Sequence, residues 1–315
     1  MTVSSVKTGF DGISFLAGNV YFFPAVRALF AGGSTGGALD VIDYINISTT
    51  GNATDFGDLT VARFDLTAVS SSTRAVFGGG ENGNQTSLYN TLDYVTIAST
   101  GNATDFGDLT QNYGYQPGSF SSSTRGLFGG GYSGSALIAG IDYITIASVG
   151  NATDFGDLSQ SRRGLSGCSS PTRGIFTGGY TGAFVNTIDY VTIDTTGNAT
   201  DFGDLTVGRY NPAACSSPTR GIIMGGNAGA ADLNVIDYVT IASTGNATDF
   251  GDLSVARNGA AASSHVRGVL AAGYIVNTID YVVINTLGNA TDFGDLTVAR
   301  HIPAGCSAGH GGLAA

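Results

Sequence analysis

The chain has 315 residues, a formal net charge of −11 and a pI near 4.4, with a single Lys and no Trp. This acidic balance excludes the basic patches that nucleic acids and anionic membranes require. Hydrophobic residues make up 42% and charged residues 12%, a composition that is neither that of a disordered chain nor that of a membrane protein.

Residues 1–24 share no pattern with the rest of the chain. The apolar stretch 13–31 is interrupted by Asn19, Pro24 and Arg27, so we expect neither a signal peptide nor a transmembrane segment. We therefore divide the chain into a non-repeat arm, residues 1–24, and a repeat domain, residues 25–315. The arm is interpreted as an anchor, an oligomerisation element or extra strands.

Internal repetition dominates the remaining sequence. The string GNATDFGDL occurs six times, with spacings of 50, 49, 47, 48 and 43 residues, starting at Gly51, Gly101, Gly150, Gly197, Gly245 and Gly288. A period of 40 to 50 residues is typical of propellers and related repeat folds.

Each repeat is interpreted as four short strands. The first is a run of small residues such as 212–216, followed by a tight Ser-Pro-Thr turn. The second resembles Arg-Gly-Leu-Phe and the third resembles 141–146, Ile-Asp-Tyr-Ile-Thr-Ile. The fourth is Ala-Thr-Asp-Phe, which we expect the Gly-Asp pair to end. Because both faces of the third strand are apolar, the sheet must be covered on both sides, which radial stacking of blades achieves.

The chain ends predict how the ring closes. Residues 301–307 match a first strand, whereas the N-terminal repeat begins with a second strand at Arg27. We therefore expect the C-terminal strand to join the N-terminal blade. The prediction is an all-β propeller of six four-stranded blades, with seven blades as the alternative if residues 5–24 add strands.

Glycine triplets, a Tyr at the start of the third strand, a later aromatic residue and then Arg resemble the kelch repeat. Tyr143 lies at the kelch Tyr position, and Phe155 lies where kelch units carry Trp. The resemblance covers residues 25–315 and implies a kelch-like β-propeller.

The amino-acid sequence of the repeats, TGNATDFGDLTVAR with CSSPTRGIF, also resembles that of repeat proteins of tailed bacteriophages, especially phages that infect marine bacteria. This resemblance implies a non-enzymatic virion structural or adhesive protein, such as a fibre, spike or appendage. Its expected partners are other virion proteins and a host-surface glycan or protein, and homo-oligomers remain open. The alternative is a lectin-like or protein-interaction propeller outside a virion.

Several motifs carry no chemistry by themselves. Asp-Phe-Gly occurs six times without the other kinase motifs, and the three histidines show no zinc or triad spacing. Cys168, Cys215 and Cys306 occupy equivalent positions, which favours small buried residues on inner strands over disulfides. We expect no cofactor. Ca²⁺ at the repeated Asn-x-x-Asp-x-x-Asp spacing is the alternative.

Charged residues recur at equivalent positions of the repeats, which we call columns. Three aspartate columns lie in Ile-Asp-Tyr, Thr-Asp-Phe and Gly-Asp-Leu, the first arginine column follows Gly-Asp-Leu, and the second begins the second strand. Together they account for 18 of the 24 acidic residues and 11 of the 12 arginines. We expect these arginines and aspartates to pair within or between blades, because the guanidinium fork bridges carboxylates and carbonyls. An acidic ring that binds cations is the alternative. The candidate structural ladders are Arg74, Arg125, Arg173, Arg220 and Arg267 with Asp93, Asp142, Asp189, Asp237 and Asp280.

The copies differ most between the second and third strands, and these loops share one face with the blade-crossing segments. Binding residues concentrate on such loops above a rigid scaffold. Tyr side chains there can stack on sugars or form a protein interface. The candidate binding residues are Glu81, Tyr89, Tyr132, Tyr180, Asn227 and Tyr274.

Overall fold

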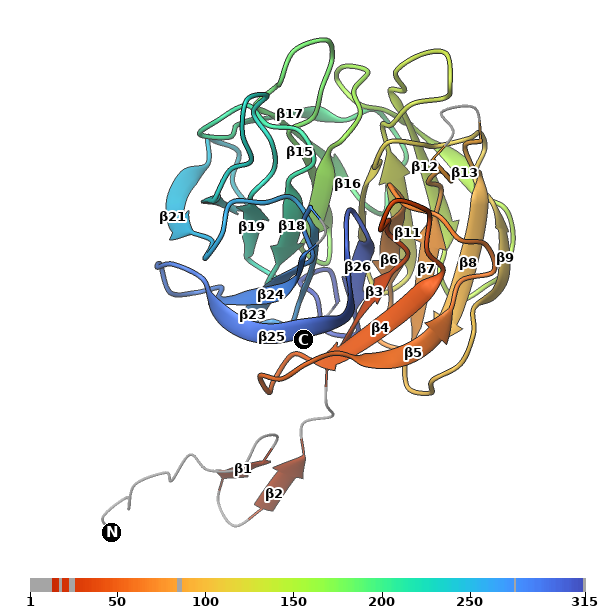
Figure 1. The fold of residues 1–315 in the computed structure, drawn as a ribbon. Coiled ribbons are helices and arrows are strands. Elements are labelled where there is room, and N and C mark those ends of the chain that lie inside the picture. The colour runs from red at the N-terminus through yellow and green to blue at the C-terminus, as the bar shows by residue number, and fades with distance from the viewer. Residues whose placement is uncertain (1–12, 17–18, 23–25, 84–86, 275, 314–315) are drawn as a thin grey trace.

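A computed structural model describes residues 13–16, 19–22, 26–83, 87–274 and 276–313. Six four-stranded antiparallel sheets are arranged in a ring (Figure 1), so the protein is a six-bladed β-propeller. The inner strands of the blades line a central channel. In each blade the strands pair from the channel outward in the order that the sequence predicts. No helix in these described ranges is long and apolar enough to cross a membrane.

The four strands of a blade occupy equivalent segments of each repeat. The inner strands are β6 (Thr67–Ser70), β10 (Gly118–Ser121), β14 (Ser166–Ser169), β18 (Ala213–Ser216), β22 (Ala260–Ser263) and β26 (Ala304–Ser307). The second strands are β3 (Arg27–Ala31), β7 (Arg74–Gly78), β11 (Arg125–Gly129), β15 (Arg173–Thr177), β19 (Arg220–Met224) and β23 (Arg267–Ala271). The third strands are β4 (Val41–Asn46), β8 (Thr91–Thr96), β12 (Gly140–Thr145), β16 (Thr187–Thr192), β20 (Val235–Thr240) and β24 (Val276–Val283). The outer strands are β5 (Thr54–Asp58), β9 (Thr104–Asp108), β13 (Thr153–Asp157), β17 (Thr200–Asp204), β21 (Thr248–Asp252) and β25 (Thr291–Arg300).

The C-terminal strand closes the ring, as the chain ends predict. β26 pairs antiparallel with β3, with Ala304 opposite Ala31 and Ser307 opposite Ala28. Figure 1 shows the blue β26 beside the orange β3. The first blade therefore contains both ends of the repeat domain, which locks the circle.

The N-terminal arm contains one hairpin, β1 (Ile13–Leu16) with β2 (Asn19–Phe22). These strands pair only with each other, and Figure 1 draws them outside the ring. The described strands therefore form six blades and not the alternative seven. The anchoring role expected for the arm falls partly on residues 1–12, 17–18 and 23–24, which lie outside the described residues.

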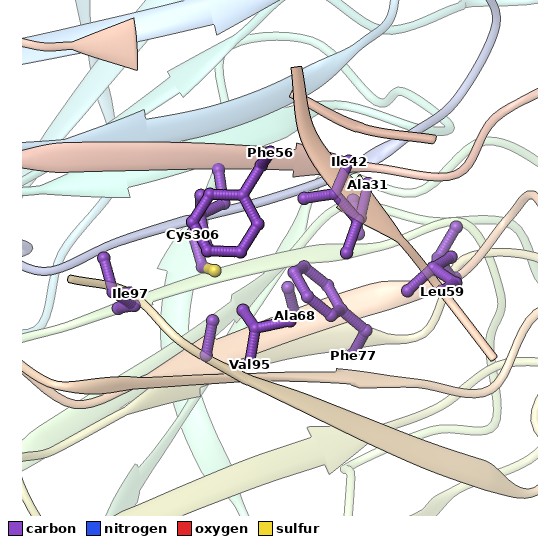
Figure 2. Close-up of a cluster of buried hydrophobic side chains, with 13 residues drawn as sticks. Ala31, Ile42, Phe56, Leu59, Ala68, Phe77, Val95, Ile97 and Cys306 are labelled. Carbon is purple, nitrogen blue, oxygen red and sulfur yellow. The ribbon is translucent and has the colours of Figure 1, made fainter. Parts of the chain in front are cut away.

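Six apolar clusters fill the six seams between neighbouring blades. Figure 2 shows the seam between the first two blades, where Phe56 and Cys306 of one blade meet Phe77 and Val95 of the next. Burying each such large side chain contributes about 1.5–3 kcal/mol. Each blade thus covers the face of its neighbour, and the ring leaves no apolar sheet face open.

The Gly-Asp pair forms the last two residues of five outer strands, so these strands end at the expected motif, but the pair is part of the strand and not a bend after it. In the first blade Ile42 lies opposite Gly57 and Asp43 opposite Asp55, which leaves Phe56 as the extra residue of a β-bulge. The bulge turns Phe56 into the seam, where it is buried. The glycine has a φ of +145°, and a Cβ there would lie 2.5 Å from the Gly101 carbonyl of the next blade.

The same motif links neighbouring outer strands by hydrogen bonds. The Asp58 N–H donates to Asn102 Oδ1 of the next blade at 3.2 Å, and the Gly101 N–H donates to the Phe56 carbonyl at 2.8 Å. The Asp-to-Asn bond recurs at all six seams. GNATDFGDL is therefore repeated because one half of the motif binds the other half in the adjacent blade.

A ring of serines closes one end of the channel. Each inner strand ends in a serine whose hydroxyl donates to the serine carbonyl of the preceding blade, at Ser70, Ser121, Ser169, Ser216, Ser263 and Ser307. The C-terminal segment 308–313 covers this end. His310 Nε2 donates to the Ser70 carbonyl at 2.9 Å, and its Nδ1 accepts from the Gly312 N–H at 3.1 Å.

Candidate functional site

Buried arginine–aspartate pairs fix the segments that cross from one blade to the next. Arg63 follows β5, is fully buried, and donates from Nη2 to Asp93 Oδ2 of β8 at 2.7 Å. The Thr60 hydroxyl donates to the same carboxylate at 2.5 Å. The equivalent ion pairs are Arg162–Asp189, Arg209–Asp237, Arg257–Asp280 and Arg300–Asp43. At the third blade Tyr113 takes the place of this arginine, beside Asp142, the equivalent aspartate. Burial raises the pKa of Asp142.

The second arginine column satisfies backbone carbonyls, as the guanidinium fork predicts, while the aspartates pair with the first arginine column instead. Arg173 Nη1 donates to the carbonyls of Ile241 and Ala242 in the next blade at 3.1 and 2.9 Å, and the guanidinium lies 4.5 Å from the Tyr190 ring centroid. Arg173 lies opposite Thr192 on β16, whereas Asp189 lies opposite Phe176, three residues further along β15, so Arg173 does not face this carboxylate. The same arrangement holds for Arg74, Arg125, Arg220 and Arg267.

Six residues, each two positions before an inner strand, surround the channel end opposite the serine ring. This channel mouth consists of Asp65, Gln116, Gly164, Asn211, Asn258 and Ile302. Backbone hydrogen bonds join neighbouring members, from the Gln116 N–H to the Asp65 carbonyl at 3.0 Å and from the Asn211 N–H to the Gly164 carbonyl at 2.8 Å. The position repeats in space, but its residue differs between most blades.

Two carboxyl groups meet at the mouth. Asp65 lies at a φ of 54°, and its side chain is within hydrogen-bonding reach of Glu81, the single Glu of the chain. Both are buried, with 4% of each exposed. Burial and then the Glu81 charge raise the pKa of Asp65 to about 8, and burial raises the pKa of Glu81. At neutral pH Asp65 is therefore the protonated member of this carboxyl pair.

An arginine outside both columns lies beside the carboxyl pair. Arg163 is half-buried, with its guanidinium 4.4 Å from the Tyr115 ring centroid and 5.6 Å from those of Tyr132 and Tyr180. Its positive charge lowers the pKa of both Asp65 and Glu81, against the effect of burial. A cation, two carboxyl groups and three aromatic rings thus come together from the second, third and fourth blades.

Beside this cluster the mouth opens into a hollow of about 390 Å³. The mouth hollow is lined by Asp65, Tyr115, Tyr210, Asn211, Asn227, Asp232, Asn258, Tyr274, His301 and Ile302. Tyr274 is 71% exposed and packs edge-on against His301 at 5.5 Å between ring centroids. Asn227 Nδ2 donates to Asp232 Oδ1 at 3.0 Å. Amides, carboxyl groups and aromatic rings around a hollow of this volume are typical of a small-molecule binding site.

Most predicted binding residues lie at the mouth. Asn227 and Tyr274 line the hollow, Glu81 belongs to the carboxyl pair, and Tyr132 and Tyr180 flank Arg163. Tyr89 does not line the hollow and lies at the end of its loop, where its N–H donates to the Gly80 carbonyl.

The structure adds residues that the sequence interpretation missed, chiefly Asp65, Arg163, Asn258 and His301. Two of them could have been found in the sequence because they break the repeat pattern. Arg163 is the one arginine outside both arginine columns, and Asp65 lies outside all three aspartate columns. For a metal, the described part of the chain offers no group of three His, Cys, Asp or Glu. The motif asparagines proposed for Ca²⁺ accept backbone N–H groups of the neighbouring blade instead.

No model of a known protein family matches the chain, and no curated protein matches it significantly. The fold and the mouth geometry are therefore the basis for function.

Proposed function

We propose that the protein is a non-enzymatic binding propeller, in which a symmetric scaffold presents the channel mouth to a ligand on another molecule. The observation that supports this is the contrast between the blades and the mouth. Seams, ion pairs and outer strands repeat almost without change, whereas Glu81, Arg163 and Asp232 occur once each in the pattern and come together at one face.

We further propose that this propeller is a structural or adhesive component of a tailed-phage virion. The support is the resemblance of TGNATDFGDLTVAR and CSSPTRGIF to phage repeat proteins, together with the kelch-like layout of the blades. In this role the mouth contacts a host-surface glycan or protein, and the arm, residues 1–24, contacts the particle. A lectin-like or protein-interaction propeller outside a virion would use the same mouth.

Two experiments test the two levels of the proposal. A glycan array and a host-surface protein pull-down with the purified protein test binding, with Tyr274→Ala as the mouth variant. Retained folding with lost binding supports the mouth, and unchanged binding contradicts it. Mass spectrometry of purified particles tests virion membership, and absence of the protein from the particles refutes that part alone.

A further inference from the structure

We infer that the mouth hollow binds one hydroxylated ring that carries no negative charge, such as a neutral sugar residue. This inference rests on the proposed function that the mouth is a binding surface. It adds the chemical class of the ligand, which follows from the hydrogen-bonding groups, the charges and the aromatic rings of the hollow.

Three side-chain acceptors beside the hollow have no hydrogen-bond donor as a partner in the described part of the chain. The Oδ1 atoms of Asp65, Asn211 and Asn258 are buried and have no hydrogen-bond donor among the described residues. Each of these residues is more than nine-tenths buried. A buried acceptor without a donor destabilises the folded protein. These atoms are closed to solvent in the structure, so a hydroxyl donor of a ligand reaches them only when their side chains turn toward the hollow. A ligand that brings hydroxyl donors then satisfies them, whereas a ligand made only of acceptors does not.

The charges of the hollow disfavour an anion. Glu81 and Arg163 offset each other beside the hollow, and Asp232 adds a further carboxylate to its lining. Burial lowers the pKa of His301, so this imidazole supplies no positive charge at neutral pH. Phosphate and carboxylate ligands bind most strongly to cationic donors such as Arg. The described residues that line the hollow include no Arg or Lys, and their side-chain N–H donors are the neutral amides of Asn211, Asn227 and Asn258 beside His301.

Aromatic rings supply the apolar contacts that a sugar ring requires. Tyr115, Tyr210 and Tyr274 line the hollow together with the amides, so it offers both apolar and polar surface to a ligand. Aromatic rings combine a large apolar face with a polar tip, which suits ligands that have C–H and O–H groups on one ring. The volume of about 390 Å³ lies at the lower end of small-molecule sites, about 300–1,000 Å³.

Saturation-transfer NMR and titration calorimetry test the inference with methyl glucoside, methyl galactoside and N-acetylglucosamine, compared with glucuronate, inorganic phosphate and CaCl₂. We expect saturable binding of at least one neutral sugar and none of the charged probes. Two variants test the position. Tyr274→Ala removes an exposed ring, and Asn258→Leu places an aliphatic side chain where the neighbouring blade carries Ile302. Each should weaken binding about tenfold or more, as loss of a central contact does.

The controls separate binding from folding. Val266→Ala removes a 58% exposed side chain from the serine-ring end and should leave affinity unchanged. Asn258→Leu should not lower the melting temperature, because it removes an acceptor that has no donor. Binding of only glucuronate, phosphate or Ca²⁺ overturns the inference, as does neutral-sugar binding that both mouth variants retain. If no neutral sugar binds but a host protein is still captured through the mouth, the proposed function stands and this inference fails. If the mouth binds neither, both fail.

Discussion

Replacing Arg162 by alanine removes the cation from one buried pair and leaves its partner in place. Asp189 is fully buried, and the Arg162 Nη1 atom lies 2.8 Å from its Oδ2. Breaking a buried pair in this way costs about 3–5 kcal/mol, because an unpaired charge remains in the interior. Ser159 continues to donate two hydrogen bonds to Asp189, from its N–H at 3.1 Å and its hydroxyl at 2.6 Å. We therefore expect the lower end of the range, about 3 kcal/mol.

Calorimetry and urea unfolding measure this loss. For a domain somewhat smaller than this ring, 1 kcal/mol corresponds to about 2–4 °C, so 3 kcal/mol predicts a fall in melting temperature of about 6–12 °C. Arg173→Ala is the matched control, because its guanidinium contacts a Tyr face and carbonyls but no buried carboxylate. Its expected loss is about 1–2 kcal/mol.

A double variant tests the cause. Arg162→Met combined with Asp189→Leu removes both charges, and such replacements are often neutral in energy. Ser159 is exposed, so water can satisfy its freed groups. The double variant should recover most of the lost stability. A cost below about 1 kcal/mol for Arg162→Ala, or a double variant as unstable as the single one, refutes the buried-charge explanation.

Two further predictions concern pH and packing. The pKa of Asp65 is raised to about 8 in the fold, so the unfolded chain loses this proton near pH 4 while the folded chain keeps it, and stability falls as pH rises between the two. The melting temperature of Asp65→Asn relative to the unmodified protein should therefore increase from pH 4 to pH 8, and a flat difference contradicts the burial of this carboxyl group. Gly174→Ala places a Cβ 1.8 Å from a ring carbon of Phe120 and should cost about 1–3 kcal/mol by urea unfolding. Gly37→Ala, where a Cβ meets nothing within 4 Å, should be neutral, and equal losses in the two variants contradict the seam packing.

The blades could be predicted because every copy of a repeat residue meets the same surroundings. Six identical motifs must all fit the same local structure. The chain begins its repeats with a second strand at Arg27 and ends them with a first strand, so the two ends complete one blade and close the ring. The β-bulge could not be predicted in this way. It depends on the Asn102 side-chain oxygen, which accepts from the Asp58 N–H, and on the Gly101 N–H, which donates to the Phe56 carbonyl. These residues of the next blade lie 44 and 45 positions beyond Asp58 and Phe56.

The mouth could be predicted only in part. The variable loops of the sequence place Glu81, Asn227 and Tyr274 at the mouth, and two of them, Asn227 and Tyr274, line the hollow. Asp65 and Asn258 come from the crossing segments, whose surroundings repeat while their residues do not, and no local motif indicates that they converge. Both arginine columns place one arginine in most repeats, so the sequence does not show which of them pairs with the aspartates. Only the strand register and the ion pairs show which column faces the buried carboxylates.

A crystal structure of the protein with the glycan that binds most strongly on the array tests the central claim, that a closed symmetric ring directs its non-repeating residues to one binding mouth. We predict glycan density in the hollow between Tyr274 and Asn258, with β26 paired to β3. Density on the outer strands or at the serine ring, or a β26 strand detached from β3, would contradict the claim.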